Sequence, residues 1–351
     1  MEFELYDLAT LLQVRRRVDD APVFWLNFFG RQINFETPYI DFENVNRRYR
    51  KLAPFVAPTA QGRVISSQGS RLTRYAPAYV KPKSVIDPNK VIARQPGEVP
   101  YQPLSNEQRR DAVIAEETRD HKARLTNRNE WLAANAVIYG SVTISGEDYP
   151  TKFVDFGRDP SLTITLTGAA KWDQTTAKPL VDLKAARRKS ADLSGTRIRR
   201  LIFGENAWDL FSQRMGFDDP KAGNLLDTTF RGSETSVSRL LDGFEGAEFA
   251  GTLTGVNGQG RFECWVYSGS YDDDNGVQVP YLDTNDVVGV GDFDGVRCFG
   301  AIHDARAGYR SLEVFMKNWE NQDPSVEYLL SQSAPLMVPG EPNATFRIRV
   351  A

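Results

Sequence analysis

The longest regular pattern of apolar and polar positions lies between Ser105 and Gly140. Ser105 and Gln108 have the spacing of a capping box, in which a serine hydroxyl and a side-chain amide satisfy backbone N–H groups at the start of a helix. No proline interrupts the stretch, so the pattern predicts a helix of about 30 residues, roughly 45 Å long. Its apolar positions are few before the alanine-rich last turns: Val113, Ile114, Leu125 and Leu132. We expect this helix to bury only a narrow stripe of its surface along most of its length. It would then act as a strut, that is, a long structural support.

Shorter strands and helices follow the long helix. β-Branched residues and period-2 alternation predict strands at 137–144, 152–157, 161–168 and 196–203. Helices are predicted from Pro179 to Ser190 and over 204–216, the second with Asn206 as its N-cap and Gly216 as its stop. The mixture predicts an α+β fold.

A hairpin and two C-terminal strands complete the predicted elements. The hairpin spans 261–282, where Asn275-Gly276 suits a two-residue type I′ turn. The strands lie at 333–339 and 344–350. In the last strand the pattern places Phe346, Ile348 and Val350 on one face and Arg347 and Arg349 on the other.

The stretch RYAPAYVKPKSVIDPNKVIARQPGEVP, residues 74–100, fits no regular element. It holds five prolines, and the prolines at 77, 82 and 88 confine any strand here to an edge or a turn. A loop this long is unusual inside a compact domain, so we expect an extended arm that lies on another surface, namely a neighbouring subunit. Residues 1–60 contain aromatic side chains without a regular pattern and also predict an arm.

Composition and charge narrow the class of protein. The 351 residues are 41% hydrophobic and 25% charged, as in soluble globular proteins, and the net charge of −3 argues against a dedicated nucleic-acid binder. No apolar run approaches the roughly 20 residues of a membrane span. The N-terminus has acids first and a basic cluster later, the reverse of a secretory signal, so we expect the chain to stay in the cytoplasm.

Charge is distributed unevenly. Residues 61–94 contain seven basic side chains and Asp87 as the single acid, which gives +6 for this segment and −9 for the remainder. Three interpretations are open: a solvated loop, a nucleic-acid-binding tongue on which Tyr75 and Tyr79 stack on bases, and an assembly arm. The opposite charges of this segment and of the remainder favour the third interpretation, in which the arm lies across the acidic surface of a neighbouring copy. The candidate assembly residues are Arg63, Arg71, Arg74, Tyr79, Lys81, Lys83, Lys90 and Arg94.

The sequence offers little for catalysis. His121 is expected as a surface residue of the long helix, where it forms an i,i+4 pair with Glu117. Asp120 and Arg124 form a second pair of this kind. His303 and Asp304 are adjacent in sequence, which favours a structural role over a catalytic pair. Cys264 and Cys298 show no zinc spacing and are expected as buried thiols.

Two further motifs fail on spacing. YDDDNG (271–276) does not place the glycine and glutamate of a calcium loop, and the glycine-rich stretches are not phosphate-binding loops. We predict no catalytic residue, no metal ligand and no cofactor, and that the chain is not an enzyme.

Several local motifs, in order, resemble one known family. They are GRVISSQG (62–69), YVKPK (79–83), VDFGR (154–158), VYSGSY (266–271), KNW (317–319) and QSAPLM (332–337). The chain resembles the lambda-type major capsid proteins of tailed phages, capsid protein E, with the Hong Kong 97-type fold. The resemblance implies an N-terminal arm (1–60), an extended loop over the adjacent subunit (61–100), a peripheral domain with a spine helix (101–190), an axial domain (191–304) and a return to the peripheral domain (305–351).

The resemblance also implies a function. Copies of the chain would form pentamers and hexamers that close into an icosahedral shell around double-stranded DNA, without sequence-specific binding to it and without a membrane. The implied partners are other copies of the chain, a scaffold protein, a portal and a decoration protein, with assembly in the host cytoplasm. Neither covalent cross-links nor proteolytic maturation is predicted. The alternatives are an α+β enzyme or carbohydrate-binding module of a phage particle, or a tail or baseplate subunit.

Overall fold

The structure is a computed structural model with the α+β fold that the sequence predicts. It describes residues 23–37, 39–45, 55, 61, 70–93, 105–146, 149–215, 246–254, 261–273, 275–323 and 325–351. Most of the predicted N-terminal arm lies outside these ranges. Within the described residues, no helix combines the length and the apolar character needed to cross a membrane.

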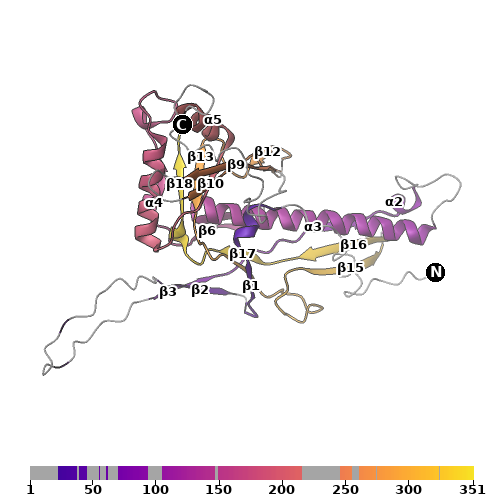
Figure 1. Ribbon diagram of the computed structural model, residues 1–351. Coiled ribbons are helices and arrows are strands. Elements are labelled where there is room, and N and C mark those ends of the chain that lie inside the picture. The colour runs from indigo at the N-terminus through magenta and orange to yellow at the C-terminus, as the bar shows by residue number, and fades with distance from the viewer. Residues whose placement is uncertain are drawn as a thin grey trace.

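The long helix α3 (Asn106–Tyr139) has 34 residues and confirms the predicted strut. The Ser105 hydroxyl accepts from the Gln108 N–H at 3.2 Å, and the Gln108 side chain accepts from the Ser105 N–H at 3.0 Å, which completes the capping box. Gly140 ends the helix in the left-handed region, with φ at 67°. Figure 1 shows α3 as the longest element of the molecule, with sheets on both sides of it.

A six-stranded mixed sheet packs near the C-terminal end of α3 (Figure 1). Its strand order is β7 (Thr163–Thr165), β18 (Thr345–Arg349), β13 (Asp286–Val290), β8 (Arg200–Phe203), β10 (Arg261–Tyr267) and β9 (Ala247–Thr254). Phe346, Ile348 and Val350 are fully buried, as predicted for one face of the last strand. They pack with α4 (Pro179–Ser194) and α5 (Glu205–Met215) in one hydrophobic cluster.

Two three-stranded sheets lie elsewhere along α3. One has the order β1 (Arg31–Asn34), β14 (Val296–Phe299) and β17 (Pro335–Val338), and the other β15 (Phe315–Gln322), β16 (Ser325–Gln332) and β4 (Lys83–Ile86). Two antiparallel pairs of strands, β5 (Ser141–Gly146) with β6 (Tyr149–Asp155) and β11 (Ser270–Asp272) with β12 (Gln278–Pro280), complete the body.

The proline-rich stretch differs from its prediction. It contains β4, which pairs antiparallel with β16, and α2 (Pro88–Ile92), whose N-cap Asp87 accepts from the Asn89 N–H at 2.9 Å. These elements have partners in their own chain, so the expectation that the whole stretch lacks them is wrong here. The prolines do lie at an edge and a turn, because β4 is an edge strand and Pro88 occupies the first turn of α2.

Two local predictions in the sheet region are also wrong. Asn206 lies inside α5 and not at its N-cap, because the Ala207 N–H donates to the Thr284 carbonyl at 2.8 Å and needs no capping side chain. The hairpin exists as β11–β12, but its loop is 273–277, since the Asp273 carboxylate accepts from the N–H groups of Asn275 and Val277. Strand β10 is not part of that hairpin and pairs with β8 and β9.

Candidate assembly surfaces

A two-stranded ribbon projects from the body of the molecule. Strand β2 (Ile40–Val45) pairs antiparallel with β3 (Ser70–Tyr75), and within the described residues neither strand pairs with any other. Figure 1 shows the ribbon pointing away from α3 and from the sheets. Such a ribbon leaves both edges open and has little core of its own, so its stability depends on its root and on any surface that it contacts.

The root of the ribbon is anchored. Ile40 is fully buried and belongs to the largest hydrophobic cluster, and Tyr75 packs against that cluster. Burial raises the pKa of the Tyr75 phenol to about 12. The strands therefore leave the body from a fixed starting point.

An ion pair connects the two strands of the ribbon just beyond the root. Arg74 donates from Nε and a terminal nitrogen to both carboxylate oxygens of Asp41, at 2.8 and 2.9 Å, and its guanidinium lies 5.6 Å from the ring centre of Tyr39. The hydrogen bond from Arg74 holds the pKa of Asp41 below its usual range. Because the pair is exposed, it fixes the register of the strands more than it stabilises the fold.

Three of the candidate assembly residues contact the body of their own subunit, and a fourth, Lys81, contacts one of these three. The Tyr79 hydroxyl donates to the Ala301 carbonyl at 2.5 Å. The Lys81 ammonium lies 4.9 Å from the centre of the Tyr79 ring, and that of Lys83 lies 4.0 Å from the Tyr328 ring. Lys90 pairs with Glu117 at 3.1 Å.

Two of the remaining candidates lie on the ribbon. Arg74 and Arg71 belong to β3, and the structure gives the backbone of Arg71. Arg63 and Arg94 lie outside the described residues. The structure thus separates Arg71 and Arg74 from the group that includes Tyr79 and Lys90, and the role of all eight residues in binding a neighbour stays a prediction.

His121 is not the surface residue that the sequence suggested. Its side chain is 1% exposed, with one ring nitrogen 2.9 Å from the Ser84 hydroxyl of β4 and the other 2.9 Å from the Ser331 hydroxyl of β16. The predicted surface position fails because the edge strand β4 covers this side of α3. The neighbouring pair Asp120/Arg124 is exposed and formed at 2.6 Å, as expected.

Glu130 holds the N-terminal turn η1 (Trp25–Phe28) against α3, and sequence analysis missed it. Its carboxylate accepts from the backbone N–H groups of Phe24, Trp25 and Leu26, at 2.8, 2.6 and 2.9 Å. Arg297 donates to the carbonyls of Leu26 and Phe29 from the other end. A signal existed, because Glu130 shares a helix face with apolar residues three, four and seven positions later.

A buried ion pair ties the other half of α3 to the outer sheet. Arg110 donates to both oxygens of Glu327 in β16, at 2.9 and 3.0 Å, and both side chains are 10% exposed. Asn318 in β15 donates to the same carboxylate at 2.8 Å. The sequence places these residues more than 200 positions apart, so no local pattern reveals the pair.

Arg158, in the VDFGR motif, joins the end of α3 to the six-stranded sheet. One terminal nitrogen donates to the carbonyl of Ile138 at 2.9 Å, and the other donates to the hydroxyl of Thr163 at 2.7 Å. Burial lowers the pKa of the guanidinium to about 10. A cation at the C-terminus of a helix interacts favourably with the helix dipole, so Arg158 satisfies carbonyls that the helix leaves open.

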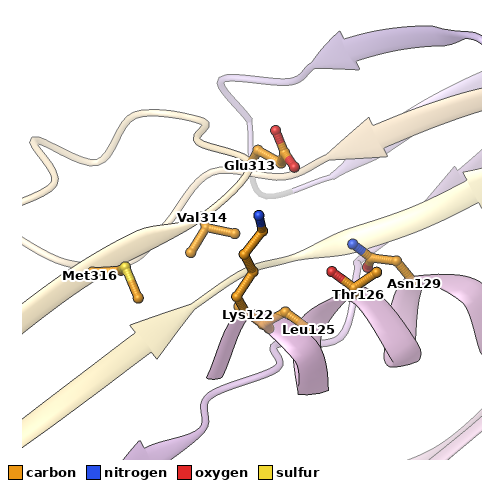
Figure 2. Close-up of a pocket in the computed structure, with 7 residues that line it drawn as sticks. All are labelled: Lys122, Leu125, Thr126, Asn129, Glu313, Val314 and Met316. Atoms are coloured by element: carbon orange, nitrogen blue, oxygen red, sulfur yellow. The ribbon is translucent and has the colours of Figure 1, made fainter. Parts of the chain in front are cut away.

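The described residues form no recognisable chemical site. They contain no group of His, Cys, Asp and Glu able to hold a metal ion. Cys264 and Cys298 are free and buried, as expected. The hollow in Figure 2 lies between Lys122 and Asn129 of α3 and Glu313 to Met316, and its volume of about 20 Å³ holds about one water.

The comparisons with known proteins cover nearly the whole chain. A family model described as phage major capsid protein E matches residues 7–350. The major capsid protein of Escherichia phage lambda is 29% identical over 357 aligned residues, and that of Escherichia phage N15 is 30% identical; each alignment covers 99% of both proteins. A crystal structure of a prophage capsid protein from Escherichia coli CFT073 superposes with a TM-score of 0.73 at 26% identity, covering 99% of this chain and 100% of that one.

Proposed function

The chain belongs to the phage major capsid protein E family, and on this premise we propose that it is the major capsid protein of a tailed phage and a structural part of the virion. The observation that carries the proposal is the family match over residues 7–350. Its fold is the Hong Kong 97-type fold of phage capsid proteins. The family is structural, which agrees with the expectation that the chain is not an enzyme.

Copies of the chain assemble into pentamers and hexamers that close into an icosahedral shell around double-stranded DNA. Repeated head-to-tail contacts suit this task, because they generate both closed rings and a closed shell. A net charge of −3 is compatible with a shell that encloses DNA without binding it tightly. Assembly takes place in the host cytoplasm, with a scaffold protein, a portal and a decoration protein as further partners.

The β2–β3 ribbon is the part of the proposed extended loop that reaches the adjacent subunit. This assignment is supported by the strand pairing, because β2 and β3 have no further strand partner among the described strands. Arg71 and Arg74 lie on the ribbon, and Arg63 lies between its strands in sequence. The segment from Tyr79 to Lys90 contacts its own subunit, so it positions the ribbon and the neighbour receives the ribbon itself.

The two ends of α3 correspond to the proposed domains. The N-terminal two-thirds, with β4, β15 and β16, forms the peripheral domain, and the six-stranded sheet with α4 and α5 forms the axial domain. Strand β18 lies between β7 and β13, so this proposal assigns β18, β7 and α4 to the axial domain, although residues 101–190 and 305–351 were expected in the peripheral domain.

Electron microscopy tests the proposed function directly. The purified full-length chain is sedimented on a gradient and imaged in negative stain. We expect rings of five or six copies and closed shells. Uniform tubes would instead indicate a tail subunit, and a compact monomer at high concentration would contradict a capsid function.

A further inference from the structure

The outer face of α4 carries basic charge that the fold does not use. Positions three and four apart place Val181, Lys184, Ala185 and Arg188 on one exposed face, and Val181 is 57% exposed. Neither Lys184 nor Arg188 has an ion-pair partner in the described part of the chain. From Lys178 to Ser194 the sequence holds five basic residues and two acidic ones.

The opposite face of α4 already anchors the helix. Leu183 and Ala186 are buried in the cluster beneath the six-stranded sheet. The buried Ser190 donates to the Asn343 carbonyl at 2.7 Å. Since these contacts position the helix, the outward charges are available for another molecule.

The β11–β12 hairpin has the complementary character. Its sequence contains three consecutive aspartates, 272–274, and no basic residue occurs between Tyr267 and Arg297. Asp272 is exposed and has no ion-pair partner among the described residues, while Asp273 holds the turn through the N–H groups of Asn275 and Val277. Val277 is 57% exposed, so this surface also combines charge with an apolar side chain.

The two surfaces lie on opposite sides of the same sheet. Helix α4 contacts β18 and the short turn η2 (Pro160–Leu162) that leads into the edge strand β7. The hairpin follows β10, which is the neighbour of the other edge strand, β9. Figure 1 shows α4 at one side of the sheet and β12 at the other. In a head-to-tail ring, one side of each copy meets the opposite side of the next.

We propose that the basic face of α4 binds the acidic β11–β12 hairpin of the next copy in the ring. This inference rests on the proposed capsid function, since it needs a ring of identical copies. Lys184 and Arg188 pair with Asp272, and the two exposed valines add apolar contact at the same place. Two observations favour a second copy of the chain over DNA as the partner of the α4 face: the exposed valines, and an acidic surface on the chain itself. DNA phosphates would contact only the basic side chains of this face.

A charge-reversal cycle on the full-length chain tests the interface. In Lys184→Glu/Arg188→Glu the like charges across the contact repel, so the yield of rings and shells on a gradient falls at least about tenfold. Asp272→Lys lowers the yield in the same direction. The triple variant Lys184→Glu/Arg188→Glu/Asp272→Lys restores opposite charges and recovers assembly. Lys184→Arg/Arg188→Lys, the matched control, keeps the charge and assembles as the original chain does.

The outcomes separate the interface from the function. Circular dichroism first shows that each variant is folded, which is expected because all the changed side chains are exposed. Failure of the unchanged chain to form rings or shells contradicts the proposed function and the interface with it. Normal assembly of the reversed variants, or no recovery in the triple variant, overturns the interface alone. Normal shells that lose packaged DNA after reversal on α4 also overturn it and assign the face to DNA.

Discussion

The charged side chains buried along α3 and at its C-terminal end each meet a defined partner. Glu130 binds three backbone N–H groups, Arg110 binds Glu327, and Arg158 binds carbonyls and a threonine hydroxyl. Burying a charge costs free energy unless hydrogen bonds replace its water, and removal of one partner leaves the other unsatisfied. These residues therefore specify how the N-terminal turn and the sheets attach to the helix.

Glu130→Ala tests the attachment of the N-terminal turn. The change leaves three backbone N–H groups without their carboxylate, and we expect a loss of about 2–4 kcal/mol in the free energy of unfolding. Urea unfolding of the unassembled chain, followed by tryptophan fluorescence, measures it, because Trp25 is fully buried beside this site.

Glu116→Ala is the matched control, since Glu116 is an exposed glutamate of the same helix. We expect this variant to change stability by less than about 0.5 kcal/mol. Equal effects of the two substitutions would show that Glu130 does not hold the turn.

His121 makes stability depend on pH. Burial lowers the pKa of His121 from its usual 6.5, Arg124 acts in the same direction, and Asp120 and Glu117 oppose it. The unfolded chain therefore binds the proton first as pH falls through about 6.5, so stability is lost on acidification. We expect the free energy of unfolding to fall from about pH 7 to about pH 5, and His121→Gln to reduce that fall.

His303→Gln provides the comparison for this pH series. His303 is exposed and lies against Tyr79, with ring centres 5.4 Å apart. Because His303 is the other histidine of the chain, this variant controls for the loss of an imidazole as such. An unchanged slope in His121→Gln would assign the acid sensitivity to other groups.

At the level of elements, the joint between α3 and the six-stranded sheet leaves no spare space. Gly140 ends α3 with positive φ, and a Cβ atom there would lie 2.7 Å from the Cβ of Arg158. Arg158 in turn needs that position to reach the carbonyls at the helix end. The close approach fixes the direction in which the chain leaves the helix.

Gly140→Ala and Gly195→Ala separate backbone strain from this close approach. Both glycines follow a helix and have positive φ, at 67° and 78°, but a Cβ at Gly195 meets nothing within 4 Å. We expect Gly195→Ala to cost about 1 kcal/mol from the left-handed backbone alone. Gly140→Ala should cost about 1–3 kcal/mol more, because Arg158 must move. Equal losses in thermal or urea unfolding would contradict a packed joint.

Elements with local signals were predictable from the sequence. The capping box and Gly140 set both ends of α3, and the alternation in 344–350 gave the buried face of β18. Contacts between distant segments were not predictable, since nothing local to His121 indicates that Ser84 and Ser331 cover it. The same holds for β4, whose ladder with β16 depends on a segment more than 240 residues away. The prediction of Asn206 as an N-cap was wrong for the same reason, because the distant Thr284 carbonyl accepts the N–H bond at the start of the helix.

At the scale of the whole molecule, the ribbon is the element that the subunit supports least. Its root is buried at Ile40, yet beyond the Arg74–Asp41 pair no other described strand extends it. A structure of this kind gains stability when its open edges and side chains contact another surface. In a shell, copies of the chain must therefore stabilise one another's ribbons.

Removing the segment that connects the two strands of the ribbon tests this requirement most directly. In the variant, residues 46–69 are replaced by Asn-Gly, which suits a tight turn between the paired ends of β2 and β3. Gradient sedimentation and negative-stain imaging then compare it with the full-length chain, after circular dichroism and urea unfolding have shown that both are folded. We predict a folded, soluble subunit that forms no shells, and shells at normal yield would contradict the account.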